Sequence, residues 1–143
     1  MAGVEVIRLA ELREDPLSVD ELSAVVSDPG AGGIALFAGA VRDSDHGRGV
    51  ARLSYSAHPS AAAELRRVAE KIAADYEVIA LAAVHRVGDL AVGDLAVVVA
   101  ASCAHRGAAF EACHAFIDLL KNEVPIWKRQ WFGDESSEWV GGA

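Results

Sequence analysis

Two apolar runs of strand length constrain the fold of this chain more than any other feature. Residues 78–84 and 95–101 consist of apolar, largely β-branched or small side chains, which is typical of strands that are buried on both faces. The segment between them, 88–94, contains two glycine turn signals and predicts a chain reversal. A third, largely apolar run at 33–41 predicts another strand.

Only two long amphipathic helices accompany these strands. After Pro59 and Ser60, apolar side chains recur at helical spacing as far as Tyr76, and charged side chains occupy the opposite face. A second helix is predicted over 107–123 and ends before Pro125. Its expected inward side chains are Ala109, Phe110, Cys113, Phe116, Ile117 and Leu120.

Shorter elements complete the predicted fold. A capping box at residues 18–21 opens a short helix that ends at Pro29 and Gly30. Residues 52–57 and 126–132 predict strands, residues 43–49 a polar and mobile loop, and the remaining tail a short polar segment. We therefore predict an α+β fold over residues 1–143: a single domain with a mixed or antiparallel sheet, two long helices and a short N-terminal helix.

The distribution of charge points to a local anion site. The chain has 13 Lys and Arg against 21 Asp and Glu, a formal net charge of −8, so we expect no nucleic-acid partner. Against this background Lys121, Lys128 and Arg129 gather around Pro125. Three cations at one chain reversal of an acidic protein predict a pocket for a small anion.

The sequence also indicates a cytoplasmic protein. The first residues lack the basic and then apolar pattern of a signal peptide, and no run approaches the ~20 apolar residues that span a bilayer, so we expect no membrane association. Cys103 and Cys113 are the only cysteines. Two thiols without an export signal are expected to be free in a reducing compartment.

Further cations lie where predicted elements begin or end. His105 and Arg106 follow a strand and begin a helix, a position whose free N–H groups favour an anion; alternatively Arg106 is solvated and His105 caps the turn. Arg42 ends a strand beside the polar loop, where a surface role is the alternative. His85 and Arg86 lead into a turn and are assigned a structural role.

Each of the two late lysines has a structural and a functional interpretation. Lys121 lies in the last helical turn, where the helix dipole alone favours a cation. Lys128 lies in a strand next to Trp127, where burial would lower its pKa and make it a usable base or nucleophile.

Other kinds of site are not indicated. The thiols with His105 and His114 fit no zinc spacing. The chain has neither the Gly-x-Ser-x-Gly turn of a serine hydrolase nor the Gly-x-x-x-x-Gly-Lys loop that binds nucleotide phosphates. We therefore expect no metal site.

Six ordered segments resemble the large, catalytic subunit of molybdopterin synthase. They cover roughly residues 33 to 132 and keep the order found in that family: Phe37-Ala-Gly-Ala-Val-Arg42, Val84-His-Arg-Val-Gly88, Ser102-Cys-Ala-His-Arg106, Ala109-Phe-Glu-Ala112, Ile117-Asp-Leu-Leu-Lys121 and Pro125-Ile-Trp-Lys-Arg129. The chain departs from the family pattern at Asp43, Ser56, His58 and Gln130.

The resemblance implies a fold, an activity and a partner. The fold would be α/β-hammerhead-like. The enzyme would add two sulfurs to cyclic pyranopterin monophosphate, and the sulfur would arrive as a thiocarboxylate on the C-terminal Gly-Gly of a small ubiquitin-like subunit. No metal or nucleotide cofactor is implied. Lys121 and Lys128 would be catalytic, and the substrate contacts would be Arg42, His105, Arg106 and Arg129.

The predicted helix imposes a geometric condition on that site. Arg106 and Lys121 are fifteen positions apart, which at ~1.5 Å per residue is ~22 Å along a helix axis. One subunit can hardly bring both to one small substrate. We therefore expect a homodimer whose sites combine the lysines of one copy with His105 and Arg106 of the other, in a heterotetramer with the small subunit.

Two other functions fit the same basic pocket. A non-catalytic dimeric module would bind a phosphorylated metabolite or the C-terminal tail of a partner without turnover. A hydrolase with Lys128 as its base would act without any partner protein.

Overall fold

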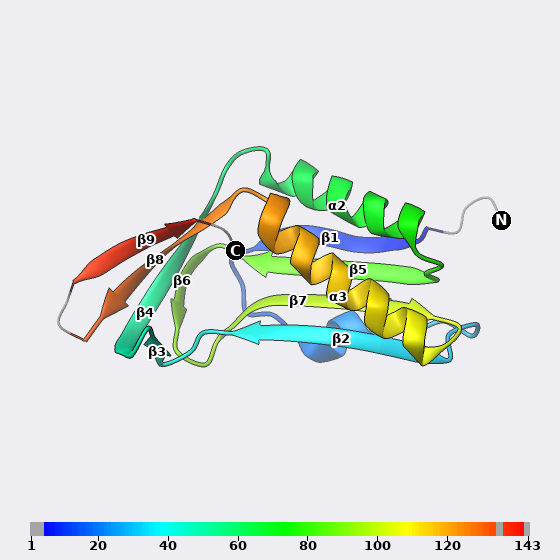
Figure 1. The fold of residues 1–143 in the computed structure, drawn as a ribbon, viewed down its shortest axis with the longest axis horizontal. Helices are drawn as coiled ribbons and strands as arrows, with labels where there is room; N and C mark the ends of the chain where they lie inside the picture. Colours follow the sequence, from blue (N-terminus) through cyan, green and yellow to red (C-terminus); the bar gives the residue numbers. More distant parts are fainter. Residues whose placement is uncertain (1–4, 134–135, 142–143) are drawn as a thin grey trace.

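The computed structural model describes residues 5–133 and 136–141, and its strands form two sheets (Figure 1). The first sheet has the order β1-β5-β7-β2. β1 is parallel to β5, whereas β5 with β7 and β7 with β2 are antiparallel. Its strands are β1 (Ile7–Arg13), β5 (Ala80–Arg86), β7 (Leu95–Cys103) and β2 (Gly33–Ala40).

The second sheet lies beyond one end of the first and is antiparallel (Figure 1). Its order is β3-β4-β8-β9, and β6 pairs with β4. The strands are β3 (Ser44–Asp45), β4 (Arg48–Ala57), β6 (Gly88–Ala91), β8 (Ile126–Phe132) and β9 (Ser137–Gly141).

Helices cover both faces of the first sheet. α2 (Ala61–Asp75) and α3 (Arg106–Glu123) lie side by side over one face, and α1 (Val19–Val25) lies behind the sheet (Figure 1). Successive side chains of β5 point to opposite faces of the sheet. Leu81 and Ala83 belong to the core beneath α2 and α3, whereas Ala80 and Ala82 belong to the core beneath α1. The apolar run predicted from the sequence is therefore buried on both faces, as a strand between two helical layers must be.

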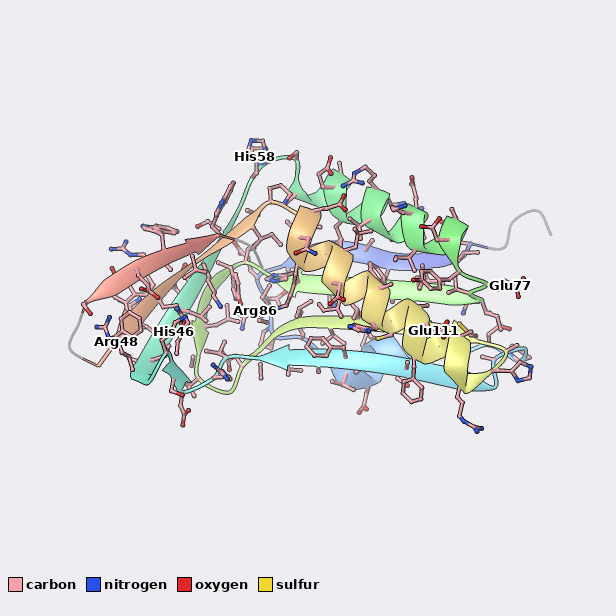
Figure 2. All side chains as sticks on the ribbon, viewed as in Figure 1. His46, Arg48, His58, Glu77, Arg86 and Glu111 are labelled. Atoms are coloured by element: carbon pink, nitrogen blue, oxygen red, sulfur yellow. The ribbon has the colours of Figure 1, made fainter. Side chains whose placement is uncertain are left out.

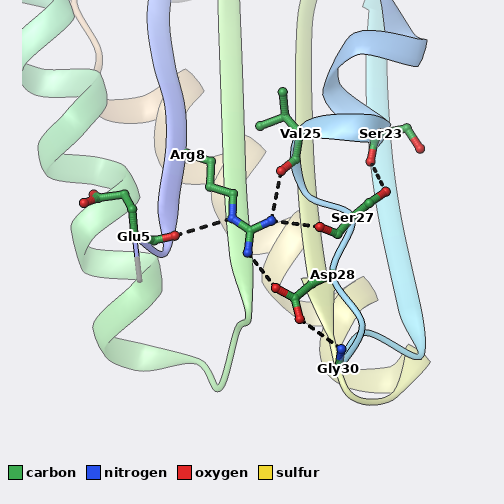
Figure 3. A network of polar contacts seen from close by, with 7 residues as sticks. All are labelled: Glu5, Arg8, Ser23, Val25, Ser27, Asp28 and Gly30. Carbon is green, nitrogen blue, oxygen red and sulfur yellow. Dashed lines mark hydrogen bonds and ion pairs between the residues drawn. The ribbon is translucent and has the colours of Figure 1, made fainter. Parts of the chain in front are cut away.

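The short helix α1 is fixed at both ends by polar contacts. Ser18 Oγ accepts a hydrogen bond from the Glu21 N–H at 3.1 Å, which confirms the predicted cap, but the Glu21 carboxylate pairs with Arg13 instead of closing the capping box. At the other end, Arg8 of β1 donates to the carbonyls of Val25 and Ser27 at 3.1 and 2.8 Å (Figure 3). These bonds satisfy carbonyls that have no partner within the helix.

The predicted α+β class is confirmed, and several local expectations are corrected. Strands β1, β6 and β9 were not predicted. β9 lies within the expected polar tail, of which residues 134–135 and 142–143 are outside the described part of the chain. The expected loop at 43–49 forms the β3-β4 hairpin, with positive φ at His46 and Gly47. Phe110 was expected to face inward and is 66% exposed; Ala112 is buried in its place among the inward side chains.

Two glycines let β2 and the loop before it approach the start of α3. A Cβ on Gly32 would lie 2.3 Å from the Ala104 carbonyl oxygen, and one on Gly33 would lie 2.9 Å from the Arg106 Cα. Real Cβ atoms do not come this close to backbone atoms, so only glycine fits. The contact fixes the N-terminal end of α3 against the beginning of β2.

We predict that Gly32→Ala lowers the free energy of unfolding by about 1–3 kcal/mol, because the added methyl group forces the backbone apart. Gly107→Ala is the matched control, since its Cβ would meet nothing within 4 Å and alanine has the higher helix propensity. Urea unfolding followed by far-UV circular dichroism measures both. Equal stabilities for the two variants would contradict the close approach described here.

Candidate functional site

A cavity of about 440 Å³ lies where the two sheets meet. Its lining comes from β2, β3, β4, β5, β7, β8 and the last turn of α3, so distant parts of the sequence build it together. The charged or titratable side chains in the lining are Arg42, Asp45, Tyr55, His85, Lys121 and Lys128. Two of the chain's three lysines therefore face one cavity.

The strand period decides which residues of β8 reach the cavity. Lys128 and Gln130 line it, whereas Trp127 and Arg129 do not. Successive side chains of a strand point to opposite faces. The neighbouring cations Lys128 and Arg129 are thus separated by the sheet itself.

Lys128 is held in an unusual electrostatic environment. Partial burial lowers its pKa from the ordinary lysine value, and the positive charges of Lys121 and Arg42 lower it further. The carboxylates of Asp45 and Glu138 act in the opposite direction. An anion that enters the cavity would relieve the repulsion among Lys128, Lys121 and Arg42, because its negative charge would lie close to all three cations.

Asp45 is fixed at the cavity by Gln130. The Gln130 side-chain amide donates to Asp45 Oδ2 at 2.8 Å and to Glu138 Oε1 at 3.3 Å. The bond from Gln130 lowers the pKa of the Asp45 carboxyl, and the nearby cations add to this effect. Asp45 is therefore a carboxylate that orders the β3 hairpin beside Lys128. It lies in β3, within the segment for which the sequence predicts a loop.

His85, for which the sequence predicts only a structural role, forms a buried part of the cavity wall. It is 1% exposed and lies edge-on to the Tyr55 ring, with 4.7 Å between centroids. Burial, the larger cause, and the charge of Lys121 lower its pKa to about 4. The only available signal in the sequence was a histidine near the end of an otherwise apolar strand.

Arg86 has the structural role that was expected for both residues. It lies where the first sheet meets the second (Figure 2). Its guanidinium donates to the Glu14 carbonyl at 2.7 Å and lies 3.6 Å from the Asp94 carboxylate. These contacts tie the end of β5 to the segments that follow β1 and β6.

Arg129 is not brought together with the two lysines. Its Nε donates to Ser137 Oγ at 3.1 Å, and its guanidinium lies 4.8 Å from the Trp131 ring centroid and 5.5 Å from that of Trp139. Arg52 also stacks on Trp131, with its guanidinium 3.8 Å from the ring centroid. Arg129 thus belongs to an arginine and tryptophan cluster on the outer face of the second sheet.

His105 and Arg106 also lie outside the cavity of their own chain. They are exposed at the N-terminal end of α3, whereas Lys121 is in its last turn. The helix spans Arg106–Glu123, so the predicted separation of ~22 Å along the axis applies. The structure therefore brings Arg42, Lys121 and Lys128 together and leaves His105, Arg106 and Arg129 apart from them.

Two further features of the described residues concern other kinds of site. No group of three or more His, Cys, Asp or Glu side chains could hold a metal ion. No helix in the described part of the chain is long and apolar enough to cross a membrane.

Comparison with known proteins identifies relatives over most of the chain. The molybdopterin synthase catalytic subunit 1 of Mycobacterium tuberculosis is 46% identical over 131 residues, covering 91% of this chain and 88% of that protein. The human molybdopterin synthase catalytic subunit is 41% identical over 128 residues, covering 89% of this chain and 68% of that protein.

Solved structures and a family model agree with these relatives. The crystal structure of molybdopterin synthase from Staphylococcus aureus superposes with a TM-score of 0.85 at 31% identity, covering 92% of this chain and 96% of that one. The family model described as MoaE protein matches residues 12–123, which is more than three quarters of the sequence. The chain belongs to the MoaE protein family.

Proposed function

We propose that this protein transfers sulfur to cyclic pyranopterin monophosphate and so forms the dithiolene of molybdopterin. The sulfur donor is the thiocarboxylated C-terminus of a small ubiquitin-like partner. Relatives that are 41–46% identical are named molybdopterin synthase catalytic subunits. The observation that carries the proposal is the convergence of Arg42, Lys121 and Lys128 on one cavity of an acidic chain, because donor and substrate are both anions.

The three cations are assigned different roles. Lys121 is exposed at the cavity rim and holds the incoming thiocarboxylate. Lys128 is half-buried with a pKa lowered from the ordinary lysine value, which suits a group that gives and takes protons. Arg42 neutralises the phosphate as its ring opens.

The shape of the cavity supports the entry of a narrow tail. Ala38, Gly39 and Ala40 form one part of its lining, so small side chains leave room beside Lys121. A C-terminal Gly-Gly segment has no side chains to obstruct such a passage. We propose cytoplasm as the site of the reaction, in accord with the two free thiols, Cys103 and Cys113.

A homodimer would complete the site with His105 and Arg106. β2 is an edge strand of the first sheet, and beside it Ile34, Phe37 and Phe110 are 44%, 38% and 66% exposed. An apolar groove between β2 and α3 includes Phe37, Phe110 and Lys121. Such an edge with exposed apolar side chains favours pairing with a second copy.

The direction of β2 determines which residues of the second copy would approach the cavity. Its first residue, Gly33, packs against Arg106, and Arg42 lies two residues beyond its last residue, Ala40. Antiparallel pairing of two β2 strands about a two-fold axis would place the beginning of each strand beside the end of the other. Arg106 of one copy would then approach the cavity of its partner.

We expect Lys121→Ala and Lys128→Ala each to slow sulfur transfer at least ~100-fold, because each removes a group that contacts donor or substrate. The third lysine, Lys71, pairs with Asp75 on α2 and provides the matched control Lys71→Ala, expected to retain nearly full activity. The assay is a single turnover with the precursor and the thiocarboxylated partner, read by mass spectrometry as sulfur gain. Binding of both ligands to the unaltered chain without product would contradict the proposed activity.

Mixing Arg106→Ala chains with Lys121→Ala chains should restore activity that neither variant has alone. Random exchange makes half of the dimers mixed, and one of the two sites in each mixed dimer is intact, so about a quarter of wild-type activity is expected. A mixture of Lys121→Ala chains with Lys128→Ala chains is the control. It should stay inactive, because each site takes both of its lysines from one copy and every copy lacks one of them. A first mixture no more active than its parents would refute the shared site.

A further inference from the structure

His85 carries an unsatisfied polar atom at the wall of the cavity. Its side chain is buried, and Nε2 has no hydrogen-bond partner among the described residues. An unpaired buried acceptor costs about 1–3 kcal/mol. Such an atom at the edge of a ligand cavity therefore indicates a donor that arrives when the site is occupied.

The other ring nitrogen defines the chemistry of Nε2. Nδ1 lies 2.7 Å from the Arg86 carbonyl oxygen, and a carbonyl can only accept a hydrogen bond, so Nδ1 carries the proton. With its pKa near 4, the ring is neutral at physiological pH. Nε2 thus presents a lone pair and can accept one hydrogen bond.

Among the described residues, the surroundings of the ring favour Lys121 as the charged donor. Leu12 and Val97 flank His85 on the neighbouring strands β1 and β7, and the Tyr55 ring lies against it from β4. Lys121 is the charged group of α3 whose field reaches the ring. Its exposed ammonium has three N–H donors, so one can bond to a neutral imidazole while the others hold an anion.

We propose that His85 is a positioning residue: its Nε2 accepts a hydrogen bond from the Lys121 ammonium when an anion occupies the cavity, and this bond fixes the lysine for sulfur transfer. The proposal rests on the function proposed above. In the free chain the cations Arg42 and Lys128 share the cavity with Lys121 and repel it. An anion removes that repulsion and lets the lysine turn inward to His85.

Nitrogen-15 NMR of the histidine ring tests the bond without any turnover. Inorganic phosphate serves as the anion, at a concentration that saturates the response of the Arg42 and Lys128 amides. The Nε2 resonance should move toward the hydrogen-bonded range in the wild-type chain and stay unchanged in Lys121→Met, which keeps the length of the side chain but has no donor. An amide response with no difference at Nε2 between the two chains would overturn the role of His85 alone.

The same titration distinguishes a failure of the role of His85 from a failure of the proposed function. If phosphate left the Arg42 and Lys128 amides unchanged, the cavity would not take the anion. That result would overturn the proposed function, and the role of His85 with it.

Two substitutions of His85 provide a second readout. Asn places an N–H near Nδ1 but nothing at Nε2, whereas the longer Gln places an amide oxygen near Nε2. His85→Asn should lower the single-turnover rate at least ~10-fold, and His85→Gln should stay within about threefold of wild type. Rates that fall equally in both variants, or in proportion to their free energies of unfolding, would show a merely structural residue and overturn the proposal.

Discussion

Repulsion among like charges is the constraint on which this structure depends. Arg42, Lys121 and Lys128 share one partly enclosed cavity, and unit charges a few ångströms apart repel by roughly 1–4 kcal/mol, depending on the local dielectric. The chain tolerates this because the three cations come from separate parts of the fold, the segment after β2, the end of α3 and β8, and because Asp45 lies at the same cavity, held by Gln130. The free cavity therefore keeps a charge imbalance that an anionic ligand can relieve.

Each level of the fold contributes one part of that arrangement. The core beneath α2 and α3 holds the last turn of α3 over the end of the first sheet. The antiparallel pairing of β4 with β8 sets the register in which Lys128 lies opposite Tyr55. The glycine contact at the beginning of β2 fixes the other end of α3, so the helix holds Arg106 and Lys121 at a constant separation.

Local patterns in the sequence predicted the elements better than they predicted the site. The apolar runs at β5 and β7 and the periodicity of α2 and α3 gave the correct element types, because burial on one or both faces leaves a direct trace in sequence. Strands β1 and β6 pair with distant segments and β9 pairs with the neighbouring β8, but none of the three has the continuous apolar run or strict alternation that marks a strand in sequence. Phe110 fitted the helical period but faces away from the sheet, at the edge where the proposed second copy would pack.

The same limit explains which site residues were found. Lys121 and Lys128 stood out because cations are rare in this chain, and they do line the cavity. Arg129 seemed equivalent to Lys128 until the strand period separated them. Asp45 and His85 could not be predicted, because only the meeting of two sheets brings a hairpin and a buried strand to the same cavity.

The central claim is that the cations of one cavity, Lys128 among them, together bind the anionic substrate, and the pH dependence of binding tests this directly. Burial and neighbouring cations lower the pKa of Lys128, so the charged form is lost as pH rises through a range below the ordinary lysine value. Calorimetric titration with cyclic pyranopterin monophosphate should show affinity falling across that range in the wild-type chain. The fall should be absent in Lys128→Arg, whose guanidinium stays protonated. The same fall in both chains, or an unchanged affinity in Lys128→Ala, would contradict the account.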